Sequence, residues 1–84
     1  MAQRLKLKVI DKDDMGRTYG YRAEDYLTVR AFNNSMTGGV TFRVFRSGKE
    51  ITLRDIDYPH DMSKKQERYV AEALHFTYKH MKRN

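Results

Sequence analysis

Hydrophobic and polar residues alternate along three segments in the first half of the chain: residues 4–10, 26–32 and 40–46. Because successive side chains of a β-strand point to opposite faces of a sheet, this alternation predicts strands that are buried on one face only. A fourth segment, residues 49–54, follows Ser47 and Gly48 and is expected to return antiparallel as the second strand of a hairpin. The residues expected to face inward are Leu5, Leu7, Val9, Leu27, Val29, Ala31, Val40, Phe42, Val44, Ile51 and Leu53.

The segments between these strands are rich in Asp, Asn and Gly. Residues 11–16, 33–39 and 55–62 are therefore expected to be turns or loops. Residues 17–22 are a weaker strand candidate, because Gly20 interrupts them and glycine in a strand interior lowers its stability. The number of strands thus stays open at four or five.

The spacing of apolar residues changes from two to about four near residue 63, which indicates a helix. Ser63 and Gln66 have the spacing of a capping box, so the helix is predicted to begin at residue 63 and to run to about residue 82. The stripe expected to face the sheet is Val70, Ala73, Leu74, Thr77 and Met81. The side expected to be exposed carries His75, Tyr78, Lys79 and Lys82.

These elements predict one α+β domain spanning residues 1–84. An antiparallel sheet of four to five strands, residues 4–54, is followed by a loop, residues 55–62, and by a C-terminal helix, residues 63–82. The helix is expected to cover one face of the sheet. No second helix is predicted, and an antiparallel sheet tolerates one face in contact with water.

Positive charge follows the predicted strands, whereas most of the acids fall in predicted turns and loops. The chain has 17 Lys and Arg residues against 11 Asp and Glu residues, a net charge of +6. The exposed sheet face is therefore expected to be basic, free of acids and dotted with aromatic residues. Cations neutralise phosphates and aromatic rings stack on unpaired bases. The residues predicted to bind nucleic acid are Lys6, Lys8, Tyr26, Arg30, Arg43, Phe45 and Arg54.

Lys64 and Lys65 stand at the predicted start of the helix, where the helix dipole favours acids rather than cations. A contact with something anionic would explain this placement.

No catalytic or metal-binding pattern accompanies the basic face. The chain has no Cys, which excludes disulfides and thiolate metal sites. Residues 11–16 superficially resemble a calcium loop, but Met15 occupies a ligand position and Arg22 stands where the bidentate Glu is needed. We therefore expect no enzyme activity, no cofactor and no metal.

Two functions stay open. The first is a small nucleic-acid-binding module for DNA or RNA. The alternative is a non-enzymatic accessory or inhibitory protein that docks on an acidic surface of a larger enzyme, such as a polymerase, a nuclease or a proteolytic chaperone complex. No apolar run is long enough for a signal peptide or a membrane span, so we expect an intracellular, cytoplasmic protein without a membrane partner. A monomer and an edge-paired dimer are both compatible with the pattern.

Overall fold

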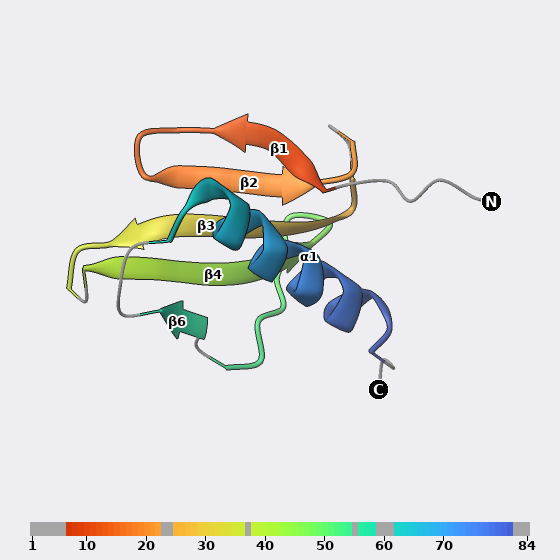
Figure 1. The fold of residues 1–84 in the computed structure, drawn as a ribbon. Helices are drawn as coiled ribbons and strands as arrows, with labels where there is room; N and C mark the ends of the chain where they lie inside the picture. Colours follow the sequence, from red (N-terminus) through yellow and green to blue (C-terminus); the bar gives the residue numbers. More distant parts are fainter. Residues whose placement is uncertain (1–6, 23–24, 37, 55, 59–61, 82–84) are drawn as a thin grey trace.

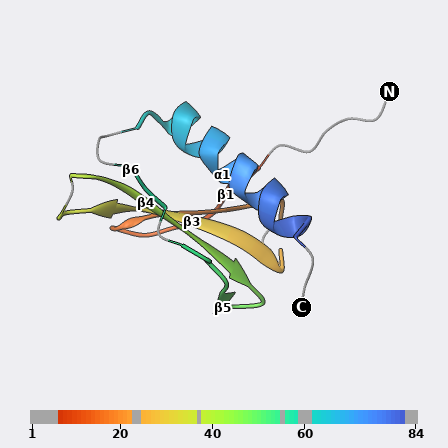
Figure 2. The same ribbon diagram turned by 90° about the horizontal axis from the view of Figure 1, so that it is seen from below.

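The centre of the molecule is a hairpin of two long antiparallel strands, β3 (Leu27–Asn34) and β4 (Gly39–Arg46). The computed structural model describes residues 7–22, 25–36, 38–54, 56–58 and 62–81. The strands β1 to β5 neighbour one another in sequence order, and β6 pairs with the other end of β4. Figure 1 shows β1 to β4 and β6, and β5 is labelled in Figure 2. The remaining strands are β1 (Lys8–Lys12), β2 (Gly16–Gly20), β5 (Lys49–Glu50) and β6 (Ile56–Tyr58).

The helix α1 (Lys64–Lys79) packs on one face of this sheet (Figure 2). Its start is the predicted capping box: Gln66 N–H donates to Ser63 Oγ at 3.1 Å, and Ser63 N–H donates to Gln66 Oε1 at 3.0 Å. The predicted fold class, an antiparallel sheet followed by one C-terminal helix, is confirmed. Within the described residues, no helix combines the length and apolar character that a membrane crossing requires.

The core lies between the sheet and α1. The alternation in β3 and β4 predicts it correctly, because the inward residues Leu27, Val29 and Ala31 of β3 and Val40, Phe42 and Val44 of β4 are all buried. The buried hydrophobic residues are Leu7, Tyr19, Leu27, Val29, Ala31, Val40, Phe42, Val44, Ala71 and Tyr78.

The N-terminal part of the sheet differs from the prediction. Strand β1 extends to Lys12, so Asp11 and Lys12 lie in a strand and not in a turn. A register shift between Val9 and Asp11 moves the later residues of β1 relative to β2. The weak candidate over residues 17–22 forms β2, which is paired on both sides. The predicted strand residues 4–6, with Leu5 and Lys6, lie outside the described residues.

The return strand of the second hairpin is shorter than predicted. Strand β5 consists of Lys49 and Glu50 alone, and Ile51 N–H still donates to the carbonyl oxygen of Val44 at 2.8 Å. The hydroxyl of Thr52 then accepts the Val44 N–H at 2.8 Å in place of a backbone carbonyl. The chain leaves the sheet there, so Leu53 is 71% exposed and its predicted inward position is wrong. The segment predicted as a loop, residues 55–62, contributes β6.

The helix is rotated relative to the predicted stripe. Val70 and Leu74 do pack against the core, but Ala73 and Thr77 are exposed and Met81 is 38% exposed. The residues of α1 that are buried are instead Glu67, Ala71, His75 and Tyr78.

Polar partners explain this rotation. Glu67 accepts hydrogen bonds from β2, the hydroxyl of Tyr78 accepts the Leu53 N–H at 3.1 Å, and His75 Nε2 lies 3.4 Å from a carboxylate oxygen of Asp25. A reading based on hydrophobicity alone assigns such side chains to the solvent.

Candidate nucleic-acid interface

The sheet face opposite α1 carries the predicted combination of cations and aromatics. Arg30 on β3 and Arg43 on β4 are register partners. Their guanidinium carbons lie 6.0 and 5.4 Å from the ring centre of Phe32, which is within the range of cation–π attraction. Phe45 is the register partner of Thr28 at the other end of the same two strands. Part of the predicted surface is thus assembled.

The expectation that this face lacks acids is wrong. Arg30 Nη2 donates to both carboxylate oxygens of Asp13, at 2.9 and 2.8 Å, because the β1–β2 turn brings Asp13 to this position. Arg43 Nη1 lies 3.7 Å from Glu50 Oε1, since β5 places Glu50 beside β4. The hydrogen bond from Arg30 is the main cause that lowers the pKa of Asp13, so this carboxyl is ionised at neutral pH. Both arginines are therefore partly neutralised.

The other predicted binding residues do not join this cluster. Lys8 lies on the edge strand β1, two strands away from Arg30. Tyr26 precedes β3, and its ring centre lies 5.8 Å from the guanidinium carbon of Arg46. Arg54 is exposed and lies outside every strand, and Lys6 is outside the described residues. Their role in binding stays a prediction.

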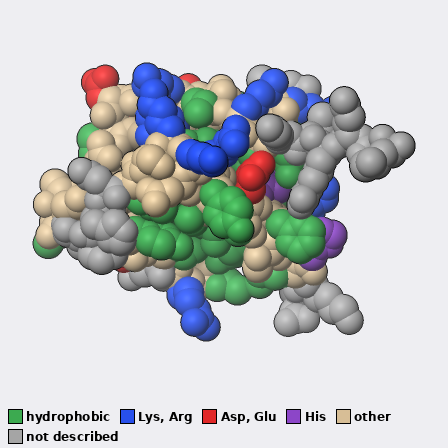
Figure 3. Space-filling view, in the orientation of Figure 1, with side chains coloured by type: hydrophobic (Ala, Val, Ile, Leu, Met, Phe, Trp, Pro, Cys, Tyr) green, Lys and Arg blue, Asp and Glu red, His purple; other side chains and the backbone are tan. Residues whose placement is uncertain are grey.

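A groove on the helix side of the sheet collects more positive charge. It lies between β1, β2 and the first turns of α1, and its volume is about 640 Å³. Figure 3 shows Lys and Arg side chains along the upper part of this face, above a central group of hydrophobic side chains. We call this groove between β1, β2 and α1 the basic groove. Its lining consists of Leu7, Lys8, Val9, Lys12, Arg17, Tyr19, Lys64, Lys65 and Arg68.

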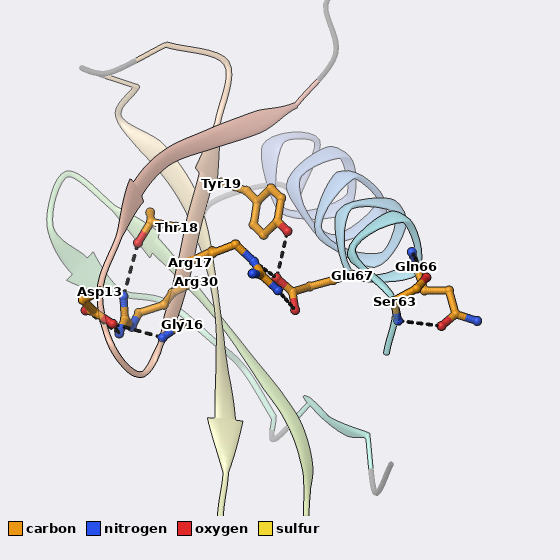
Figure 4. A network of polar contacts seen from close by, with 9 residues as sticks. All are labelled: Asp13, Gly16, Arg17, Thr18, Tyr19, Arg30, Ser63, Gln66 and Glu67. Atoms are coloured by element: carbon orange, nitrogen blue, oxygen red, sulfur yellow. Dashed lines mark hydrogen bonds and ion pairs between the residues drawn. The ribbon is translucent and has the colours of Figure 1, made fainter. Parts of the chain in front are cut away.

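A buried carboxylate holds one of these cations in place. Arg17 donates from Nε and Nη2 to the two oxygens of Glu67, at 2.8 and 3.0 Å, and the hydroxyl of Tyr19 donates to Glu67 Oε1 at 2.8 Å (Figure 4). Burial, together with the hydrogen bond to Glu67, raises the pKa of Tyr19 to about 12 and keeps the phenol protonated. The hydrogen bond to Glu67 also raises the pKa of Arg17. This network joins β2 to α1 beneath the groove.

The other cations of the groove lack such compensation. Among the residues that the structure describes, none of them makes an ion pair. Arg68 also lines the groove, and its buried Nε has no hydrogen-bond partner in that part of the chain. Lys64 and Lys65 occupy the first turn of α1, where the helix dipole disfavours cations and a bound anion would relieve the repulsion. The uncompensated cations are Lys8, Lys12, Lys64, Lys65 and Arg68.

One signal for the groove is visible in the sequence: Lys64 and Lys65 stand at the start of the helix. The rest of the groove is not visible there, because the pattern places Lys12 in a turn and Arg17 in a weak strand candidate, whereas both lie in paired strands. About fifty residues separate these strands from the helix, and only the packing of α1 brings them together.

A second groove lies between β6 and α1, with a volume of about 450 Å³. Tyr58, Met62, Val70 and Tyr69 line it together with Lys65 and Gln66. In the described part of the chain, no group of three or more His, Asp or Glu side chains is placed to hold a metal ion.

The chain matches no protein-family model, no curated protein and no solved structure. Function is therefore inferred from the surface of this chain alone.

Proposed function

We propose that the protein is a non-enzymatic nucleic-acid-binding module that contacts phosphates through the basic groove. The observation that carries this proposal is the convergence of six cations from β1, β2 and α1 on one groove. Among the described residues, only the buried carboxylate of Glu67 forms an ion pair with one of them, Arg17. Lys and Arg that neutralise phosphates release counterions, which supplies most of the affinity for a polyanion. The open sheet face is less suited to binding phosphates, because its arginines form ion pairs with Asp13 and Glu50.

The test is a pair of double variants with equal charge change. Lys12→Glu with Lys64→Glu is expected to raise the Kd for a labelled duplex or single strand by about 30-fold at moderate salt, because each lost phosphate contact weakens binding and flattens the salt dependence by about one. The control, Lys49→Glu with Lys79→Glu, changes two exposed lysines outside the groove. It is expected to stay within about threefold of the wild type. Fluorescence anisotropy at several salt concentrations measures both.

Folding does not confound this test. Lys12 and Lys64 are both exposed, and a glutamate in the first turn of α1 suits the helix dipole. For the wild type, we expect a log–log salt slope of about −3 to −5, which corresponds to roughly four to six neutralised phosphates. Equal losses in the two double variants would show that only net charge matters. A larger loss in Arg43→Glu would place binding on the sheet face.

A second candidate function is docking on an acidic protein surface, and the exposed aromatics of α1 favour it. Tyr69 is 73% exposed and Phe76 is 59% exposed on the solvent side of the helix. Rim cations and buried aromatics together are typical of a protein interface. We expect that such a complex would be stoichiometric, would survive nuclease treatment and would be lost in Tyr69→Ser with Phe76→Ser. Gel filtration of the nuclease-treated protein with its copurified partner measures this, and retention in the serine variant would rule out this surface.

A further inference from the structure

The cations of the basic groove stand on two sides of it. Lys12 and Arg17 are register partners on β1 and β2, whereas Lys64, Lys65 and Arg68 come from the first turns of α1. A ligand lying in the groove would thus meet positive charge from both walls. A volume of about 640 Å³ falls within the range of roughly 300–1,000 Å³ that is usual for ligand-binding clefts.

Apolar side chains also line the groove, namely Leu7, Val9 and Tyr19. Val9 pairs with Tyr19, whose hydroxyl reaches α1, so both residues belong to the helix side of the sheet. The helix crosses the central strands and leaves β1 uncovered, which explains why Val9 is 42% exposed (Figure 1). The side chains of Leu7 and Tyr19 are buried. Contact with Val9 offers a charged phosphate no favourable interaction. The apolar face of a base, by contrast, is stabilised by such a contact.

These features distinguish between two forms of nucleic acid. A duplex presents phosphates and sugars at its outer surface and keeps the faces of its bases stacked inside. An unpaired strand alternates phosphates with accessible base faces. A groove that combines several cations with the exposed apolar side chain of Val9 matches the unpaired strand, because the phosphates and the base face then each have a suitable contact.

We propose, on the basis of the proposed function, that the basic groove takes an unpaired strand of nucleic acid. Its phosphates lie against Lys12, Lys64 and Arg68, and one base lies against Val9. The guanidinium of Arg68, which lines the groove, donates to a phosphate or base oxygen.

The experiment compares three labelled probes on the 84-residue chain. The probes are a thymidine oligonucleotide of about 12 nucleotides, the same strand without bases, and a duplex of the same length. We expect the thymidine strand to bind about tenfold more tightly than the abasic strand, because the abasic strand has no base that could bury the apolar side chain of Val9. Val9→Ser is expected to reduce this ratio to about two. Phe45→Ser, on the opposite face, is expected to preserve it.

The outcomes separate the two proposals. If all three probes bind with similar affinity and with similar salt slopes, the groove reads phosphates alone, and the inference fails while the proposed function stands. If none of them binds at low salt, both fail. A preference for the thymidine strand that survives in Val9→Ser and disappears in Phe45→Ser would place the base on the sheet face and overturn the inference.

Discussion

Replacing Gly16 with alanine is expected to lower the free energy of unfolding by about 3 kcal/mol, because the added methyl group has no room. A Cβ at this position would lie 2.0 Å from the carbonyl oxygen of Ala31 and 2.6 Å from the Cα of Phe32. Both are backbone atoms of β3, the strand paired with β2 at this point, so no side chain can move aside. For a domain of this size the total stability is roughly 4–13 kcal/mol.

The matched control is Gly48→Ala. Gly48 has a φ of +83°, and nothing lies within 4 Å of its added Cβ, so the cost there is only that of the left-handed backbone, about 1 kcal/mol. Urea unfolding followed by circular dichroism measures both variants. Equal losses in the two would mean that β2 and β3 do not approach each other as closely as the structure has it.

Gly16 also illustrates what the sequence could not reveal. The pattern around it suggests a turn, and its role depends on the proximity of Phe32 across the ladder, which no local signal encodes. By contrast, the alternation in residues 26–32 and 40–46 predicted the buried faces of β3 and β4 correctly. Their inward side chains meet a continuous apolar core, so the local pattern and the tertiary environment agree.

The helix, too, was predictable where it depends on local sequence and not where it depends on tertiary contacts. Its start was predictable, because the capping box is a local arrangement between Ser63 and Gln66. Its rotation was not, because Glu67 and His75 are buried by virtue of polar partners in β2 and near β3. A sequence lists charged residues, but it does not show which of them meet.

The position of the candidate site also depends on tertiary contacts. The sequence predicts a basic surface on the open sheet face, because most acids fall in segments that are expected to be turns or loops. In the structure, Asp13 and Glu50 return to that face and pair with Arg30 and Arg43. The concentration of uncompensated cations arises instead around the groove between the first turns of α1 and the β1–β2 hairpin, a proximity set by packing alone.

Replacing Glu67 with alanine is expected to cost about 3 kcal/mol of folding stability, which is typical when one partner of a buried pair is removed. The guanidinium of Arg17 and the hydroxyl of Tyr19 would both lose their acceptor. Glu67→Gln keeps the size and one acceptor oxygen, and it is expected to cost about 1–2 kcal/mol. Thermal unfolding measures the two costs, and a fully stable Glu67→Ala would contradict the network.

Although Glu67→Gln lowers stability, it is expected to strengthen binding, because Arg17 then becomes an uncompensated cation beside the groove. We expect the affinity for nucleic acid at low salt to rise about fivefold, as one additional phosphate contact would produce. Glu50→Gln is the matched control, since it releases Arg43 on the other face of the sheet. A rise in Glu67→Gln alone supports binding in the basic groove, and a rise in Glu50→Gln alone would assign binding to the open sheet face. The carboxylate that joins α1 to β2 thus stabilises the fold while it limits the positive charge of the groove.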